Sequence, residues 1–201
     1  MISKKLNITD NFIIFLFATL PISTIIGNFF INLNLFCILL IFSSIIFKTK
    51  NFSWLQDKNF KILLFFYLYI CINSLINFFI SPQFGNDGLV RSIFFLKFLI
   101  LFPAVPLLID KTEKLEKIFK FWIIVISILI IDIFFEKFYG SNLLGFKSLD
   151  GTRITSFFYD ENVVGTFLLC FGFITSAFFL KNKLTKKYKI ILSLLVVLVL
   201  L

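Results

Sequence analysis

The sequence predicts an all-α, polytopic integral membrane helix bundle, and three observations support this: composition, the length of the apolar runs and the distribution of basic residues. Of 201 residues, 59% are hydrophobic and only 15% are charged, whereas about a quarter of the residues in soluble domains are charged. The 32 phenylalanines exceed what a soluble globule of this size can hide from water. Lipid is therefore the solvent that this chain matches.

Long apolar runs recur along the chain. A helix needs roughly 20 apolar residues to cross the hydrocarbon core of a bilayer. The uncharged stretch from Phe12 to Phe47 would form a helix of about 54 Å, which is too long for one crossing. Gly27 and Asn28 mark a turn within it, and Pro21 is tolerated as a kink in the first helix. We therefore expect about seven crossings, the last one truncated, at residues 12–28, 30–47, 62–80, 92–109, 118–136, 163–180 and 190–201.

The basic residues lie mainly between the apolar runs. Lys and Arg concentrate in short cytoplasmic loops, and 15 of the 20 basic residues fall before the first predicted crossing or after an even number of crossings. This pattern predicts a multi-pass membrane protein with a cytoplasmic N-terminus. The net charge of +9 is then explained by topology and anionic-lipid contact, and no nucleic-acid partner is expected.

The last apolar run is short. Residues 190–201 would form a helix of about 18 Å, which does not reach across the bilayer core. We therefore expect residues 1–201 to be a single transmembrane domain at the N-terminal end of a longer protein, without activity as this fragment.

The cysteine and histidine content excludes several kinds of site. The chain has no histidine, so it supplies no imidazole base and no histidine ligand for a metal. Its three cysteines all lie inside apolar runs and form no disulfide framework. No metal site and no cofactor are predicted.

Two segments hold most of the charge that lies outside the predicted cytoplasmic loops. The first is an expected exported loop at residues 83–91, which ends at Arg91 and is followed by Lys97 two turns further along. The second is the long exported loop at residues 138–162, in which charged residues and glycines are mixed with apolar side chains. Charge kept near a membrane is a candidate for function because its desolvation is costly.

The second segment resembles part of a known family. The run Gly151 to Leu168, GTRITSFFYDENVVGTFL, is similar to the segment that leads into a mid-chain helix of bacterial O-antigen ligases and polymerases. Asp132 to Gly140, Asn142 to Gly145 and the position of Arg91 resemble the same family. Residues 160–162 read Asp-Glu-Asn, where many relatives carry an Asn-Pro-Asn-like turn, so ligase and polymerase both stay open.

The resemblance implies an activity and a set of site residues. Such enzymes transfer or polymerise a glycan from an undecaprenyl diphosphate carrier to an acceptor glycan or lipid at the periplasmic face of the bacterial inner membrane, without a metal or cofactor. In ligases of the family the candidate general base is a histidine in a later periplasmic loop, which here would lie beyond residue 201. By the resemblance, the diphosphate-binding residues would be Arg153, Arg91 and Lys97, supported by Asp160, Glu161 and Asn162.

Each of these residues also has a purely structural interpretation. Arg153 could pair with a neighbouring aspartate at the interface, and Arg91 and Lys97 could extend to the headgroups as anchors. Asp160 and Glu161 precede the sixth crossing, where acidic residues cap a helix N-terminus.

Asp132 and Glu136 lie one helical turn apart, on the same face of the fifth crossing. In a soluble glycosidase such a pair would suggest an acid and a base. In a membrane helix we expect them to face the bundle interior or the interface and to pair with Lys97 or Lys137.

A multi-pass transporter or flippase-like protein is the alternative function. Transporters carry helices broken by Gly or Pro near the middle of the membrane, and Pro103 and Pro106 in the fourth crossing fit this pattern.

Overall fold

The computed structural model describes residues 2–147, 154–158 and 163–181. These residues form helices joined by short connections, and no strand occurs among them. Contacts divide the chain into two compact units, residues 33–111 and residues 1–32 with 112–201. Five helical stretches within the described ranges are long and apolar enough to cross a membrane. The chain is thus a membrane-type helical protein, as its composition predicts.

The five stretches are Asn28–Thr49, Lys58–Ile80, Asn86–Leu108, Thr112–Tyr139 and Val164–Lys181. They correspond to the second to sixth predicted crossings. The seventh predicted crossing, residues 190–201, lies outside the described residues.

The first predicted crossing, residues 12–28, is divided between two helices. Helix α1 (Ile2–Ala18) ends before Thr19, and α2 (Leu20–Ile26) follows with Pro21 in its first turn. Pro21 has no N–H to donate to the carbonyl four residues earlier, that of Phe17. The indole Nε1 of Trp122 donates to this carbonyl at 3.0 Å. The kink predicted at Pro21 is therefore stabilised by a residue from a distant helix.

The predicted turn at residues 27 and 28 is confirmed as a helix break. Gly27 has φ +128° and ψ −179° and separates α2 from α3 (Asn28–Thr49). This backbone conformation is essentially restricted to glycine. A glycine at position 27 is therefore what allows the helix to break here.

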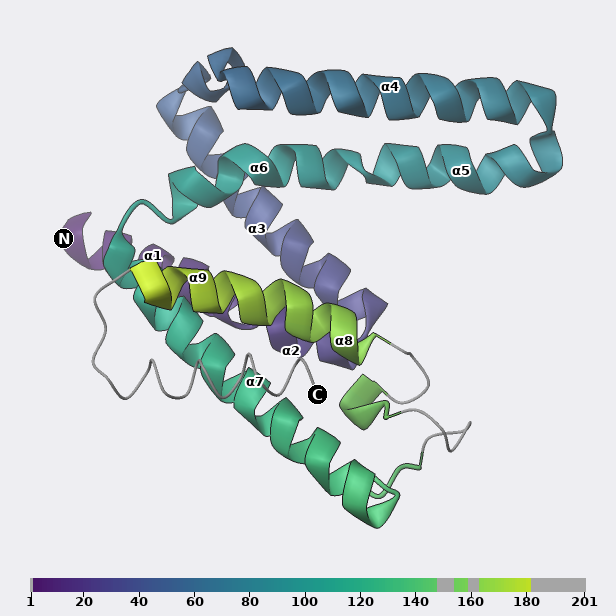
Figure 1. The fold of residues 1–201 in the computed structure, drawn as a ribbon. Helices are drawn as coiled ribbons and strands as arrows, with labels where there is room; N and C mark the ends of the chain where they lie inside the picture. The colour runs from purple at the N-terminus through teal and green to yellow at the C-terminus, as the bar shows by residue number, and fades with distance from the viewer. Residues whose placement is uncertain (1, 148–153, 159–162, 182–201) are drawn as a thin grey trace. The chain divides into compact units, whose positions relative to one another are not determined.

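The unit of residues 33–111 contains a helical hairpin. Helix α4 (Lys58–Ile80) runs along α5 (Pro82–Phe94) and α6 (Leu96–Leu108), as Figure 1 shows. The short 3₁₀ turn η1 (Ser53–Gln56) precedes α4. The prediction of an exported loop at residues 83–91 is wrong, because these residues lie in α5. Pro82 begins that helix, a position where its missing N–H costs nothing.

The other unit is built around α7 (Thr112–Tyr139), which packs against α1, α2 and α9 (Phe173–Lys181) (Figure 1). Rings from several helices fill this core, including Trp122 and Phe171 with centroids 4.9 Å apart. Between α8 (Val164–Phe167) and α9 the sixth crossing contains one π-helical turn, η3 (Leu168–Gly172). Helix α7 continues to Tyr139, so the loop predicted at residues 138–162 begins two residues later, at Gly140.

Candidate functional site

The C-terminal end of α7 presents two buried carboxyl groups. Asp132 and Glu136 are separated by one turn and therefore share a face of the helix. Their exposed fractions are 0% and 6%, so the expectation that they face the bundle interior is confirmed. Gly140 then ends the helix with φ +72°, and its N–H donates to the carbonyl of Glu136 at 2.8 Å. The chain turns back toward the two carboxyl groups from this point.

Asn142 organises the turn that follows α7. Its Oδ1 accepts hydrogen bonds from the backbone N–H groups of Leu144 at 3.1 Å and Phe146 at 2.8 Å. Gly145 supplies the positive φ, +84°, that this tight turn needs. The Nδ2 of Asn142 donates to the carbonyl of Ser156 at 2.9 Å. One buried amide therefore joins the start of the loop to a residue fourteen positions later.

The two carboxyl groups bind both ends of the same loop. Asp132 accepts from the N–H of Leu143 at 2.6 Å and from the hydroxyl of Ser156 at 2.5 Å. Glu136 accepts from the N–H groups of Thr155 at 3.2 Å and Ser156 at 2.5 Å. We call Asp132, Glu136, Asn142 and Ser156 the loop anchor.

Ser156 is the central residue of the loop anchor. It is 1% exposed, and its φ of +51° lies in the left-handed region, which is uncommon for a residue with a side chain. Such a conformation persists where surrounding contacts determine it, and here the N–H, the carbonyl and the hydroxyl of Ser156 are all hydrogen-bonded. The loop is therefore held in a defined conformation at this residue.

An aromatic contact continues from the loop anchor to the sixth crossing. The 3₁₀ turn η2 (Ser156–Phe158) places the ring of Phe158 5.4 Å from that of Phe167 in α8. Both rings are buried. The anchored segment thus packs on the helix that follows the predicted site.

Asp132 and Glu136 act here as hydrogen-bond acceptors for the loop. The predicted pairing with Lys137 is wrong, because each carboxyl group is bonded to loop groups and Lys137 is exposed. The physical reason is that three backbone amides and one hydroxyl reach the buried face without the cost of desolvating an ammonium group. Lys97 belongs to the other unit, so the pairing with it stays a prediction. Among the described residues no group of three or more His, Cys, Asp or Glu side chains is arranged to hold a metal ion.

The predicted site residues are distributed between the two units. Arg91 is exposed on α5, and Lys97 is half-buried on α6 with its Nζ 5.1 Å from the ring centre of Phe98. Both belong to residues 33–111, whereas the segment after Arg153 belongs to the other unit. Four predicted residues lie outside the described ranges: Arg153, Asp160, Glu161 and Asn162.

Two residues of the loop anchor were not singled out from the sequence. Asn142 lies between Gly140 and Gly145, and an Asn between glycines is a turn signal that could have identified it. Ser156 gives no comparable signal, because its role depends on a positive φ and on carboxyl groups 20 and 24 residues away. Comparison with known proteins finds no family model, no curated protein and no solved structure that matches this chain.

Proposed function

We propose that this protein is a membrane glycosyltransferase of the O-antigen ligase or polymerase type, which takes its glycan from a polyprenyl diphosphate carrier. The segment from Arg153 to Gly165 carries the resemblance to that family. One structural observation supports the proposal: Thr155 and Ser156, two and three residues after Arg153, are held by the buried carboxyl groups of α7. The carboxyl groups therefore fix the described segment that directly follows the proposed binding residue.

The proposed reaction needs positive charge at a membrane surface. The acceptor hydroxyl oxygen attacks the anomeric carbon of the glycan, and the bond from that carbon to the carrier diphosphate breaks. The electron pair passes to a phosphate oxygen, and the hydroxyl proton passes to a general base, to which no residue of this chain is assigned. Guanidinium groups suit the leaving diphosphate because they offer paired planar donors and stay charged.

The residues proposed to bind the diphosphate are Arg153 and Arg91, with Lys97 as a third cation. Arg91 is exposed on its helix, so its guanidinium is open to a ligand. The loop anchor is assigned a positioning role, since a charged group stabilises a transition state most when it is oriented in advance. Asp160, Glu161 and Asn162 remain proposed supporting residues.

A transporter remains the second candidate, favoured by the geometry of the fourth crossing. Phe95, where α5 gives way to α6, keeps right-handed helical φ and ψ, so the helical path continues there, and the feature that favours a transporter is the pair Pro103 and Pro106 within α6. Hydrophobic helices that contain proline near the middle of the membrane are a feature of transporter substrate sites.

Substitution of Arg153 tests the proposal in cells that express the protein from its own gene. We expect Arg153→Ala to reduce glycan transfer about 100-fold, the loss seen when one donor to a developing negative charge is removed. Arg153→Lys, the matched control, keeps the charge without the paired donors and should retain part of the activity. The amount of protein in the membrane is measured in parallel.

The carrier intermediate distinguishes the two candidates. If the protein is a transferase, Arg153→Ala leaves lipid-linked glycan unused in the outer leaflet of the membrane. If it is a transporter, the same change leaves lipid-linked glycan in the inner leaflet. Unchanged transfer by Arg153→Ala at normal membrane levels would contradict the proposal, as would labelling of a cysteine at position 153 from the cytoplasmic side only.

A further inference from the structure

One side of α4 is left exposed by the described residues of its unit. Helices α5 and α6 run along the other side (Figure 1). Side chains on the exposed side recur at spacings of four, three, four, three and four residues, the pattern by which one helix presents a continuous seam to another. We call them the outer stripe: Ile62, Phe66, Tyr69, Asn73, Ile76 and Ile80. All six are exposed, and the five besides Asn73 are 51–73% exposed.

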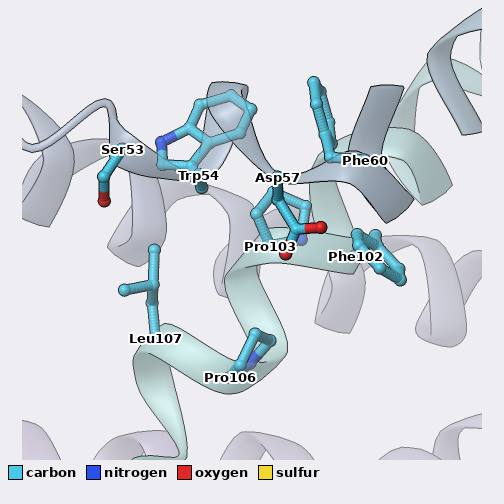
Figure 2. A pocket seen from close by; sticks show the side chains of 8 residues that line it. All are labelled: Ser53, Trp54, Asp57, Phe60, Phe102, Pro103, Pro106 and Leu107. Atoms are coloured by element: carbon cyan, nitrogen blue, oxygen red, sulfur yellow. The ribbon is translucent and has the colours of Figure 1, made fainter. Parts of the chain in front are cut away.

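The first turn of α4, in contrast, is packed within the unit. Phe60 is buried, and its ring lies edge-on to that of Trp54 with centroids 4.9 Å apart. Figure 2 shows both rings at a pocket of about 290 Å³, together with Phe102 and Pro103 of α6. These contacts hold α4 beside α6, so the unit itself fixes which side of α4 carries the exposed residues.

Two polar side chains of the outer stripe lie near the middle of the candidate membrane span Lys58–Ile80. Tyr69 is the central residue of this span, and Asn73 follows one turn later, about 6 Å along the helix axis. Both residues therefore lie within a hydrocarbon core that extends about 15 Å on either side of its centre. A polar group without a partner is costly in such surroundings.

The Asn73 amide has no hydrogen-bonding partner among the described residues. Asn32 in α3 shows one way in which a helix satisfies an amide, because its Nδ2 donates to the carbonyl of Asn28, one turn earlier, at 2.7 Å. Asn73 makes no such bond to the described part of α4. Its amide oxygen and two N–H groups are therefore available to a neighbour in the membrane, as is the hydroxyl of Tyr69.

A second copy of this protein matches these groups in chemistry and in depth. An amide is both donor and acceptor, so Asn73 of one copy can donate to Asn73 of the other and accept from it. Copies of one chain insert in the same orientation, which makes their α4 helices parallel and brings identical residues to the same depth. Lipid tails offer neither donor nor acceptor. In coiled coils, one Asn at such a seam position specifies register and oligomeric state.

We infer that two copies of this protein associate in the membrane through their outer stripes, related by a two-fold axis along the membrane normal. The two Asn73 side chains form reciprocal hydrogen bonds near the middle of the interface, with the Tyr69 hydroxyls one turn away. The apolar residues of the stripe pack against their counterparts on both sides of these groups. Association of membrane helices depends on such packing and on hydrogen bonds between helices.

Disulfide cross-linking in membranes tests which side of α4 meets the second copy. Ile76→Cys and Leu75→Cys are compared in a variant whose three cysteines are replaced by alanine. The two positions are neighbours with similar exposure, 51% and 45%, but only Ile76 belongs to the outer stripe. A disulfide requires closely approaching Cβ atoms. With copper phenanthroline as the oxidant, Ile76→Cys should therefore give several-fold more cross-linked dimer than Leu75→Cys.

Energy transfer between labelled copies in liposomes, at increasing ratios of lipid to protein, tests the role of the amide. Bilayers are used because excess detergent separates the copies into different micelles. Asn73→Leu, which removes the amide at similar size, should raise the dissociation constant about tenfold. Asn73→Gln keeps an amide and should stay within about threefold of the wild type. Leu75→Ala, the control on another side of α4, should leave association unchanged.

Circular dichroism checks that each variant keeps its helical content. The inference would be overturned by any of three results: no energy transfer between wild-type copies, equal cross-linking of Ile76→Cys and Leu75→Cys, or wild-type association of Asn73→Leu. Neither measurement depends on glycan transfer, so this inference and the proposed function can fail separately.

Discussion

Helices α4 and α7 are both apolar enough to cross a membrane, yet they place their polar groups differently. In the most apolar 18-residue stretch of α7, half of the residues are buried within the protein. In the corresponding stretch of α4, none is buried. The polar side chains near the end of α7, Asp132 and Glu136, are buried and hydrogen-bonded. Asn73 and Asn77 of α4 are exposed. Two helices of similar hydropathy therefore have different roles. Helix α7 binds a folded loop through buried polar groups, whereas most of the surface of α4 is not covered by the rest of the protein.

The largest expected effect is that of Asp132→Ala. The change leaves the part-buried N–H of Leu143 and the buried hydroxyl of Ser156 without their acceptor, and we expect the free energy of unfolding to fall by about 3 kcal/mol. Thermal unfolding in detergent, followed by circular dichroism, measures the loss. Glu116→Ala is the control in the same helix, because its ion pair with Lys120 is exposed and worth under about 1 kcal/mol. Equal effects of the two changes would show that the loop anchor does not stabilise α7.

A smaller loss is expected for Trp122→Phe, which removes the donor to the Phe17 carbonyl and keeps an aromatic ring. We expect a decrease of about 1–2 kcal/mol in the free energy of unfolding. A double-mutant cycle with Pro21→Ala identifies the cause, because alanine at position 21 supplies an N–H to the same carbonyl. The cost of Trp122→Phe should then shrink in the Pro21→Ala background, and additive effects would contradict this explanation.

Ser156 allows backbone strain and side-chain bonding to be separated. Ser156→Ala loses the hydroxyl bonded to Asp132 and keeps the strain of a positive φ, whereas Ser156→Gly loses the hydroxyl and relieves the strain. We expect the glycine variant to be more stable than the alanine variant by about 1 kcal/mol. Chemical unfolding of the two proteins measures the difference. A more stable alanine variant would show that the left-handed conformation is not retained.

The smallest effect is expected in α4. Asn73→Ala and Asn77→Ala change exposed side chains, so we expect each to alter the free energy of unfolding by less than about 0.5 kcal/mol. The same thermal unfolding assay applies. A loss as large as that of Asp132→Ala would mean that these amides have a partner in the purified protein and that the contrast between the two helices does not hold.

The positions of the long helices could be predicted from the sequence because membrane crossing depends on local composition. Runs of about 20 apolar residues bounded by lysines define them. The turn at Gly27 and a kink at Pro21 were predicted as well, since glycine permits backbone conformations closed to other residues and proline lacks an N–H. The division of the first crossing into two helices was not predicted. The helix at residues 82–94 was not, because its first half is polar and contains two glycines, which weakens any local helical signal.

The partners of buried polar groups were decided by the tertiary structure alone. Periodicity placed Asp132 and Glu136 on one face but did not show that Ser156 would fill their hydrogen bonds. In the same way, the contact between Trp122 and Phe17 joins residues 105 positions apart. Apolar burial is nondirectional and can be inferred from residue type. Hydrogen bonds require particular atoms to meet, so their partners follow only once the chain has folded.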